Sequence, residues 1–396
     1  MTTKLYYTSP STTEWMTTIT SCREDGDTYI VTLAETAFYP EGGGQPSDKG
    51  MIEDIPVIDV FEQNGEVYHR LPSLPSTSTI HCQIDADRRL DHTQQHSGQH
   101  LLSAVCIDLF DAHTVSFHLG SDIVTIDLNI PSLSEHELMA IEDRVNELIY
   151  ANIPVKTYYV SKEEAHTIPF RKLPDVDGEI RVVEIKGVDV SACCGTHVAR
   201  TGEIGMIKLL KTERHRGMTR LSFKCGKRAL DDYRASHTIL TNISQQFGTN
   251  REMLFDVLCK LESENKELQK QLQQLKQVIY GSEAQTSAQQ AENIPVVVRL
   301  YEQYTMKDLQ AIANEIVTRY NKTAILATTT EHRLVMVKSP SLSLHVGQLF
   351  KQQLEAMNGK GGGNERQAQA TFSTIEDVHA FMHWLETEVM RVTAND

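Results

Sequence analysis

Two short clusters far apart in the chain constrain its fold more than any other feature. The first is His96-Ser97-Gly98-Gln99-His100, and the second is Cys193-Cys194-Gly195-Thr196-His197. Each offers two metal ligands at positions i and i+4, and together they read His, His, Cys, His. Neutral imidazole and thiolate are the ligands that Zn²⁺ prefers, and four of them complete a tetrahedron. The fold must therefore bring two distant segments to one centre.

The first cluster belongs to a longer stripe of histidines. His92, His96 and His100 follow one another at four-residue intervals, so they share one face of a helix, which we expect to begin with Asp91 as N-cap and Gln94 as its N3 partner. A buried imidazole needs a hydrogen-bond partner, so three in a row favour a metal role for two of them. The residues alone leave open which two.

Length and composition fit an ordinary globular protein with more than one core. A chain of 396 residues predicts two to three domains, and 40% hydrophobic and 23% charged residues are typical of soluble proteins. No apolar run is long enough for a membrane helix and the N-terminus lacks a signal-peptide pattern, so we expect a cytoplasmic protein without a membrane partner. Seven widely spread cysteines favour reduced thiols over a disulfide framework.

The charge of the chain is uneven. The net charge of −15 argues against nucleic acid, yet the stretch Met206–Arg228 holds eight basic residues against one acid, Glu213. The eight are Lys208, Lys211, Arg214, Arg216, Arg220, Lys224, Lys227 and Arg228. This basic strip either follows a phosphate backbone or is a solvated face.

The pattern of strands and helices predicts an α+β protein in four parts. Residues 1–88 are expected to form a β-rich, barrel-like subdomain with a hairpin turn at Asn64-Gly65, and residues 89–228 a zinc-binding α+β core. Residues 229–285 read as a helical, coiled-coil segment, and residues 281–293 as a polar linker. Residues 293–396 read as an α/β domain.

Two glycine-rich stretches stand out from these elements. Gly42, Gly43 and Gly44 lie between Pro40 and Pro46, so they form a loop that is either a turn or a place of close approach to a ligand. Gln45 adds an amide with two donors and one acceptor. The second stretch, 358–364, is expected to be a loop whose backbone N–H groups can form an anion nest. It matches no dinucleotide or P-loop motif.

The helical segment carries a heptad seam. Its members are Leu254, Leu258, Leu261, Asn265, Leu268, Leu272, Leu275 and Ile279, with Asn265 at an a position. The seam predicts a homodimer through residues 251–280, or packing against the helix that contains Leu230 and Phe247.

The sequence lacks the catalytic motifs of several common hydrolase classes. Ser97 stands where the glutamate base of an H-E-x-x-H metalloprotease would be, and no Ser-His-Asp arrangement is visible. Metal-assisted hydrolysis of an activated ester, with water as nucleophile, is the reaction that needs the fewest catalytic side chains. The residues therefore indicate a zinc protein with a basic strip that acts on an RNA-linked substrate.

At this point four motifs carry a resemblance to a known family. HSGQHLL and CCGTHVARTGEIG resemble the HxxxH and CxxxH pair of the alanyl-tRNA synthetase editing domain and of its free-standing relatives, the AlaX proteins. TAFYPEGGGQPSDKG resembles their glycine motif, and GKGGGNERQAQATF resembles the glycine-rich motif of the C-terminal domain shared with DHH phosphoesterases. The chain resembles the long form of AlaX, without an aminoacylation domain.

The resemblance implies a function and a set of site residues. AlaX proteins hydrolyse the ester between alanine tRNA and a wrong amino acid, serine or glycine. The implied Zn²⁺ ligands are His96, His100, Cys193 and His197, which leaves Gln45 and His92 as candidates for a catalytic role. Thr36 matches a threonine of the family near the glycine loop. Together with the glycine motifs and the basic strip, the candidate substrate-binding residues are Thr36, Gly43, Gly44, Gln45, Arg214, Arg216, Gly361, Gly362 and Gly363.

Some points stay open at this stage. Cys194 stands where the family has glycine, so Cys193 and Cys194 could exchange as ligand. A non-catalytic, zinc-stabilised tRNA-binding protein is the alternative function. A phosphoesterase is a weaker third, because the aspartate cluster of that family is missing.

Overall fold

The computed structural model describes residues 1–172 and 178–394 and has the mixed α+β character that the sequence predicts. The chain divides into two compact units, Met1–Ile243 and Ser244–Asp396, which are described separately. Within the described residues no helix is both long and apolar enough to cross a membrane.

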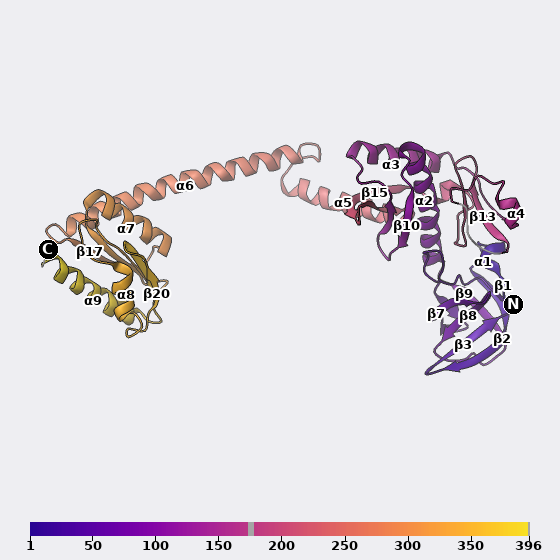
Figure 1. Cartoon of the computed structure of the whole chain (residues 1–396), viewed down its shortest axis with the longest axis horizontal. Helices are drawn as coiled ribbons and strands as arrows, with labels where there is room; N and C mark the ends of the chain where they lie inside the picture. Colours follow the sequence, from indigo (N-terminus) through magenta and orange to yellow (C-terminus); the bar gives the residue numbers. More distant parts are fainter. Residues whose placement is uncertain (173–177, 395–396) are drawn as a thin grey trace. The chain divides into compact units, whose positions relative to one another are not determined.

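The first unit begins with a seven-stranded antiparallel sheet in the order β6-β5-β9-β2-β3-β8-β7, curled into a half-barrel (Figure 1). Its interior is apolar, and the predicted hairpin is present because Asn64 and Gly65 both have the positive φ that its turn needs. The elements of this part are β1 (Thr3–Lys4), α1 (Leu5–Thr8), β2 (Glu14–Asp25), β3 (Thr28–Leu33), β4 (Glu35–Thr36), β5 (Gly50–Ile52), β6 (Ile55–Pro56), β7 (Asp59–Gln63), β8 (Glu66–Leu71) and β9 (Thr79–Ile84).

The rest of this unit is built around the long helix α2 (Ala86–Phe110). Its core is shared by α2, α3 and the antiparallel sheet β10-β11-β16-β15. A second antiparallel sheet, β12-β13-β14, leads into the segment with Cys193. The elements are β10 (Thr114–Leu119), β11 (Val124–Leu128), α3 (Glu135–Tyr150), β12 (Val155–Val160), α4 (Lys162–Ala165), β13 (Ile180–Ile185), β14 (Asp189–Ala192), the 3₁₀ turn Thr201–Ile204, β15 (Ile207–His215), β16 (Met218–Cys225) and α5 (Gly226–Gln246).

Helix α2 starts earlier than the sequence predicts. Asp85, not Asp91, is the N-cap, and its carboxylate accepts a hydrogen bond from the backbone N–H of Arg88 at 3.0 Å. The first turns are charged on all sides and lack apolar periodicity, so the pattern gave no sign of them. Helix α3 begins with a capping box, in which Ser134 and Glu137 bond to each other in both directions.

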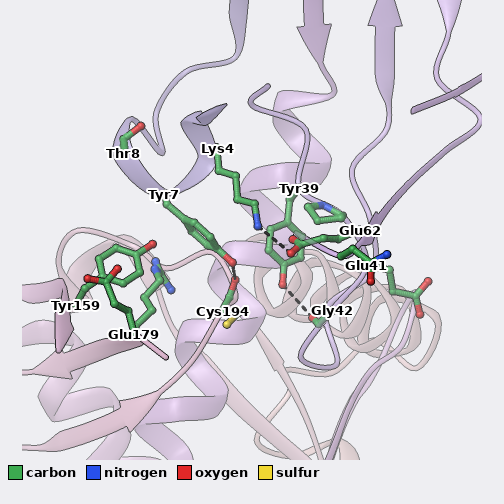
Figure 2. Close-up of a pocket in the computed structure, with 13 residues that line it drawn as sticks. Lys4, Tyr7, Thr8, Tyr39, Glu41, Gly42, Glu62, Tyr159, Glu179 and Cys194 are labelled. Atoms are coloured by element: carbon green, nitrogen blue, oxygen red, sulfur yellow. Dashed lines mark hydrogen bonds and ion pairs between the residues drawn. The ribbon is translucent and has the colours of Figure 1, made fainter. Parts of the chain in front are cut away.

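A cavity of about 600 Å³ lies in the first unit, between the N-terminal sheet part and the β12-β13-β14 sheet (Figure 2). Lys4, Tyr7 and Tyr39 line it from the N-terminal part, and Tyr159 and Arg181 line it from the second sheet. Cys194 also lines it, so the cavity adjoins the second ligand cluster.

The second unit is a five-stranded sheet, β17-β18-β19-β21-β20, with an apolar core on each face. Strand β18 shows both, since Ile325 and Ala327 belong to one core and Ala324 and Leu326 to the other. The elements are α6 (Leu254–Gln290), β17 (Val296–Tyr301), α7 (Met306–Tyr320), β18 (Thr323–Thr328), β19 (Arg333–Val337), α8 (Val346–Gln353), β20 (Lys360–Gly363), β21 (Gln367–Thr371) and α9 (Ile375–Thr393).

Two expectations for this unit are wrong. Residues 281–290 are not a linker: α6 continues through them, because the small side chains of Ala284, Ser287 and Ala288 are buried where α6 packs against α7. Gly361–Gly363 are not a loop with an anion nest but part of β20, paired with β21. A Cβ on Gly361 or Gly363 would lie 2.1 Å from a carbonyl oxygen of β21, so glycine is required there by close backbone approach.

Candidate metal centre

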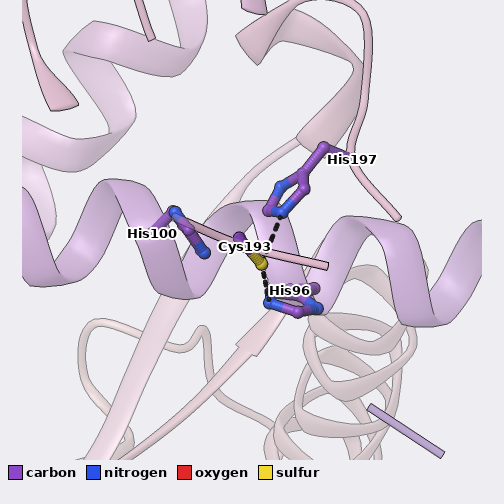
Figure 3. A group of neighbouring side chains, drawn as sticks. All are labelled: His96, His100, Cys193 and His197. Atoms are coloured by element: carbon purple, nitrogen blue, oxygen red, sulfur yellow. Dashed lines mark hydrogen bonds between the residues drawn. The ribbon is translucent and has the colours of Figure 1, made fainter. Parts of the chain in front are cut away.

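The structure brings together the four predicted ligands His96, His100, Cys193 and His197 (Figure 3). Their candidate ligand atoms all lie within 4.8 Å of one another. The Nε2 atoms of His96 and His197 are each 3.3 Å from the sulfur of Cys193. Two imidazoles come from one face of α2, and the other two ligands come from the segment after β14.

Each histidine ring has a hydrogen-bond partner at its Nδ1 atom. Gln45 Oε1 accepts a hydrogen bond from the backbone N–H of Thr196, so it is the oxygen of that amide and must also accept from His96 Nδ1 at 2.9 Å. The carboxylate of Asp189 can only accept, so His100 Nδ1 donates to it at 3.2 Å.

The third ring is held in the same way. The hydroxyl of Ser97 lies 3.3 Å from His197 Nδ1 and accepts from the backbone N–H of Val198. With the Nδ1 atoms engaged, the Nε2 atoms of His96 and His197 are left to face the thiol. Such outer partners fix the tautomer and the orientation of metal-binding histidines.

The electrostatics of the group suit a cation bound by thiolate. Burial opposes ionisation of the Cys193 thiol, but the rings of His96, His197 and His100 outweigh it and hold its pKa well below the usual range. Burial lowers the pKa of His197 to about 3, so this ring is neutral at physiological pH and its lone pair is available. Zn²⁺ binds the thiolate form of cysteine and the neutral form of histidine, so the lowered pKa values of Cys193 and His197 suit this ion.

Cys193, not Cys194, points into the group. The backbone N–H of Gly195 donates to the Cys193 sulfur at 3.3 Å, whereas Cys194 is exposed and lines the neighbouring cavity. Glycine is required at the following position, Gly195, because a Cβ there would lie 2.1 Å from the ring of His96. The geometry thus separates the two adjacent cysteines that the sequence left interchangeable.

The glycine loop supports the group through Gln45. Gly42 and Gln45 bond to each other in both directions, and Gly43 and Gly44 between them have φ of 58° and 81°, which glycine adopts without strain. A Cβ on Gly44 would also lie 2.7 Å from Phe117. The tight turn places Gln45, with 0% of its side chain exposed, directly against His96.

Two predicted site residues lie outside the ligand group. His92 is buried against the backbone of Pro46 and its pKa falls to about 4, chiefly through burial; within the described chain its Nδ1 has no hydrogen-bond partner. Thr36 is buried, with its hydroxyl 2.9 Å from His69 Nε2 and accepting from the N–H of Phe38. Their side chains therefore pack in the interior.

The basic strip is largely neutralised by acids from elsewhere in the chain. Six of its eight cations form ion pairs: Lys208 with Glu142, Lys211 with Glu213, Arg220 with Asp127, Lys224 with Asp122 and Asp232, Lys227 with Asp231, and Arg228 with Asp91. Arg214 and Arg216 are exposed near the turn between β15 and β16, and neither forms an ion pair with a described residue. Of the eight cations, Arg214 and Arg216 are therefore the two without an ion-pair partner among the described residues.

The predicted glycine site of the second unit is close to a smaller cavity. Gly362 and Gly363 line a space of about 220 Å³ together with Gln310, Asn364 and Gln369. These side chains offer amides and no charge.

Sequence reasoning missed four side chains that shape the centre: Ser97, Asp189, Tyr7 and Arg181. Ser97 and Asp189 hold ligand rings, while Tyr7 and Arg181 bond to the backbone of the ligand segment. Asp189 precedes Cys193 by four residues, and Ser97 is next to His96, so proximity to a ligand was the available signal for these two. Tyr7 gave no signal.

Known proteins resemble this chain over most of its length. The family model "Threonyl and Alanyl tRNA synthetase second additional domain" matches residues 180–222, and the "DHHA1 domain" model matches residues 293–390. The alanyl-tRNA editing protein AlaX-L of Pyrococcus horikoshii is 30% identical over 386 residues, which cover 92% of this chain and 93% of that protein.

Animal proteins give similar matches. The alanyl-tRNA editing protein Aarsd1 of Rattus norvegicus is 32% identical over 378 residues, 90% of each chain. Aarsd1 of Danio rerio is 37% identical over 247 residues, 61% of this chain and 60% of that protein.

Proposed function

Because the chain belongs to the family of alanyl-tRNA editing proteins, we propose that it hydrolyses the ester between alanine tRNA and a wrongly attached amino acid, serine or glycine. The cofactor we assign is Zn²⁺, held by His96, His100, Cys193 and His197. The observation that supports this best is the arrangement of the rings, with their Nδ1 atoms engaged and two Nε2 atoms 3.3 Å from the half-buried thiol of Cys193. We place the reaction in the cytoplasm, where charged tRNA is used.

Zn²⁺ bound at these ligands would supply Lewis-acid polarisation of the ester carbonyl or of a water molecule. The protein's part is to fix the protons around the ligands. Gln45 keeps a proton on His96 Nδ1, and Asp189 keeps one on His100 Nδ1. Asp189 also accepts from Ser191 and faces Arg171, so it is fully engaged and not a free base. We therefore infer that the free hydroxyl of the terminal ribose relays a proton from the attacking water to the ester oxygen, which becomes a ribose hydroxyl when its bond to the acyl carbon breaks.

The test is release of amino acid from mischarged tRNA. Zinc-loaded protein with seryl-tRNA(Ala) should liberate serine over time, and the same protein with alanyl-tRNA(Ala) gives the selectivity. His96→Ala and Cys193→Ser should lose zinc and turnover together. Cys22→Ser, which changes an exposed cysteine outside both the ligand group and the lining of the neighbouring cavity, should keep both. A folded, zinc-free variant that releases serine at the wild-type rate would contradict the proposal.

A second candidate is a tRNA-binding protein in which zinc is only structural. The observation in its favour is the number of ligands, because four protein ligands close a tetrahedron whereas catalytic sites keep one position open. A gel-shift or filter-binding experiment with the same mischarged tRNA distinguishes the two. Tight binding without release of serine supports this second candidate.

A further inference from the structure

Most of helix α6 is solvent-exposed on all sides. Its last turns pack on α7 of the second unit, where Tyr280 and Ala284 are buried. From Phe255 to Ile279, every residue except the half-buried Val257 and Lys276 is exposed, and Figure 1 shows this part of α6 extending beyond the sheet of the second unit. This stretch is about 38 Å long, and a helix in a protein is stabilised mainly by packing. The exposed part of α6 therefore needs a partner.

One stripe of this exposed stretch is apolar. The stripe is the heptad seam, with leucine at the d positions 254, 261, 268 and 275, and with Leu258, Asn265, Leu272 and Ile279 at the a positions. After Leu254, the leucines and the isoleucine of the seam are 41–63% exposed. An apolar heptad repeat sustained over roughly three to four heptads is typical of a coiled coil. The partner that fits is therefore another helix with the same repeat.

Asn265 restricts the partner further. Its Oδ1 atom accepts a hydrogen bond from Gln269 Nε2 at 2.9 Å, one turn along α6, which leaves its NH₂ group to donate across the seam. A buried amide without a partner is costly. In a parallel, in-register pair of identical helices, Asn265 meets the same residue of the second copy, which supplies the acceptor. In an antiparallel pair, a positions face d positions, so Asn265 would lie against leucine.

The residues beside the seam are compatible with this parallel pairing. Position g of one helix then faces position e of the other, five residues later. The facing pairs are Val257 with Glu262, Glu264 with Gln269, and Gln271 with Lys276. No pair brings like charges together, so the flanks do not oppose association.

We propose that α6 binds a second copy of this chain through the heptad seam, in a parallel, in-register, two-stranded coiled coil with the two Asn265 side chains in one layer. The sequence leaves two partners for the seam, a second copy or α5. The amide favours the copy, because an identical helix in register always supplies an amide in the same layer. Each α6 leads into its own C-terminal sheet, so the dimer carries both of these sheets at one end of the coil. This interface is independent of the hydrolase function.

The mass of the zinc-loaded full chain tests the association, and a cysteine crosslink tests the orientation. Sedimentation equilibrium should give about twice the chain mass of 44.6 kDa. For the crosslink, the exposed cysteines Cys22, Cys194 and Cys259 are changed to serine and Leu275→Cys is added. Position 275 faces its own copy only in the parallel pair, so oxidised glutathione should join two chains by one disulfide and leave two molecules of reduced glutathione.

Lys270→Cys in the same background is the matched control. Lys270 is equally exposed on α6 but occupies an f position, on the side of the helix away from the seam, so this variant should stay uncrosslinked. Crosslinking of Leu275→Cys without crosslinking of Lys270→Cys supports the parallel pair. A wild-type mass of one chain, as expected if the seam packs on α5, overturns the proposal.

A mixture of Leu258→Cys and Leu275→Cys chains detects the other orientation. An antiparallel pair places positions 258 and 275 in one layer, so a disulfide between them, identified by mass spectrometry, also overturns the proposal. Asn265→Leu added to this mixture should make association tighter and allow both orientations, because the amide fixes the register at a cost in stability. If Asn265→Leu still gives no disulfide between positions 258 and 275, Asn265 does not set the orientation and the amide layer is wrong.

Discussion

Gln45→Ala offers the sharpest test of the metal centre, because Gln45 is not a ligand. Its oxygen accepts from His96 Nδ1 at 2.9 Å and from the Thr196 N–H at 3.1 Å, and its amide nitrogen donates to the Thr196 hydroxyl at 2.9 Å. Without this acceptor, His96 is free to rotate or to carry its proton on Nε2. We expect weaker zinc binding with all four ligands still present.

The magnitude follows from the kind of partner that is lost. Removal of an outer hydrogen-bond partner typically costs 10- to 100-fold in metal affinity. Gln45 is a neutral acceptor, and neutral hydrogen bonds are about half as strong as charged ones, so we expect the lower end, about tenfold or 1.4 kcal/mol. Asp189→Ala removes a charged partner of His100 and should weaken binding more than Gln45→Ala.

Zinc competition with a chromophoric chelator measures the affinity directly. As a check, the extra stability conferred by a fixed zinc concentration should fall by about 1.4 kcal/mol in denaturant unfolding. Gln95→Ala is the matched control: Gln95 is equally buried on α2, and its amide bonds to the backbone of Cys225 in both directions, away from the ligands. Both variants should lose stability, since each leaves buried backbone groups unpaired.

Only Gln45→Ala should lose zinc affinity. If its zinc dissociation constant stays within about twofold of that of Gln95→Ala, the outer hydrogen bonds do not orient His96, and the account of the centre given above is wrong.

Three further outcomes are expected. Burial lowers the pKa of His69 to about 4, from about 6.5 in the unfolded chain, so the unfolded state binds this proton at a higher pH than the folded state. As the pH falls from 6.5 through 4, the wild type should therefore lose about 3 kcal/mol of unfolding free energy from this group. His69→Gln should lack this loss when unfolding by urea is measured across the same pH range. Arg214→Ala with Arg216→Ala should reduce the salt dependence of tRNA binding by about two units of slope, whereas Lys227→Ala, whose cation is already paired with Asp231, should change it little. Leu268, Leu272 and Leu275 are exposed on α6, so if the heptad seam joins two copies, Leu268→Glu with Leu272→Glu should convert a dimer to a monomer in sedimentation experiments, and a wild-type monomer would refute the predicted dimer.

The predictable part of the centre is what local periodicity determines. His96 and His100 lie one turn apart, so their shared face follows from helix geometry alone. The capping box of α3 and the turn at Asn64-Gly65 are local for the same reason, because each depends on residues a few positions apart. Gln45 is different: it meets His96 across 51 positions of sequence, and only the packing of the glycine turn against α2 and Phe117 brings them together.

The free charge of the basic strip and the glycine strand could not be read from the sequence, for the same physical reason. Arg220 and Arg228 are counted as free charges in the sequence, but Asp127 and Asp91 neutralise them from other elements. Gly361 and Gly363 read as a flexible loop, but the close approach of β21 excludes a Cβ and makes glycine the residue that fits a strand there. In both cases a residue's role is set by a neighbour distant in sequence. For the tRNA binding that we propose, the positive charge of the strip is therefore better sought at Arg214 and Arg216 than along its whole length.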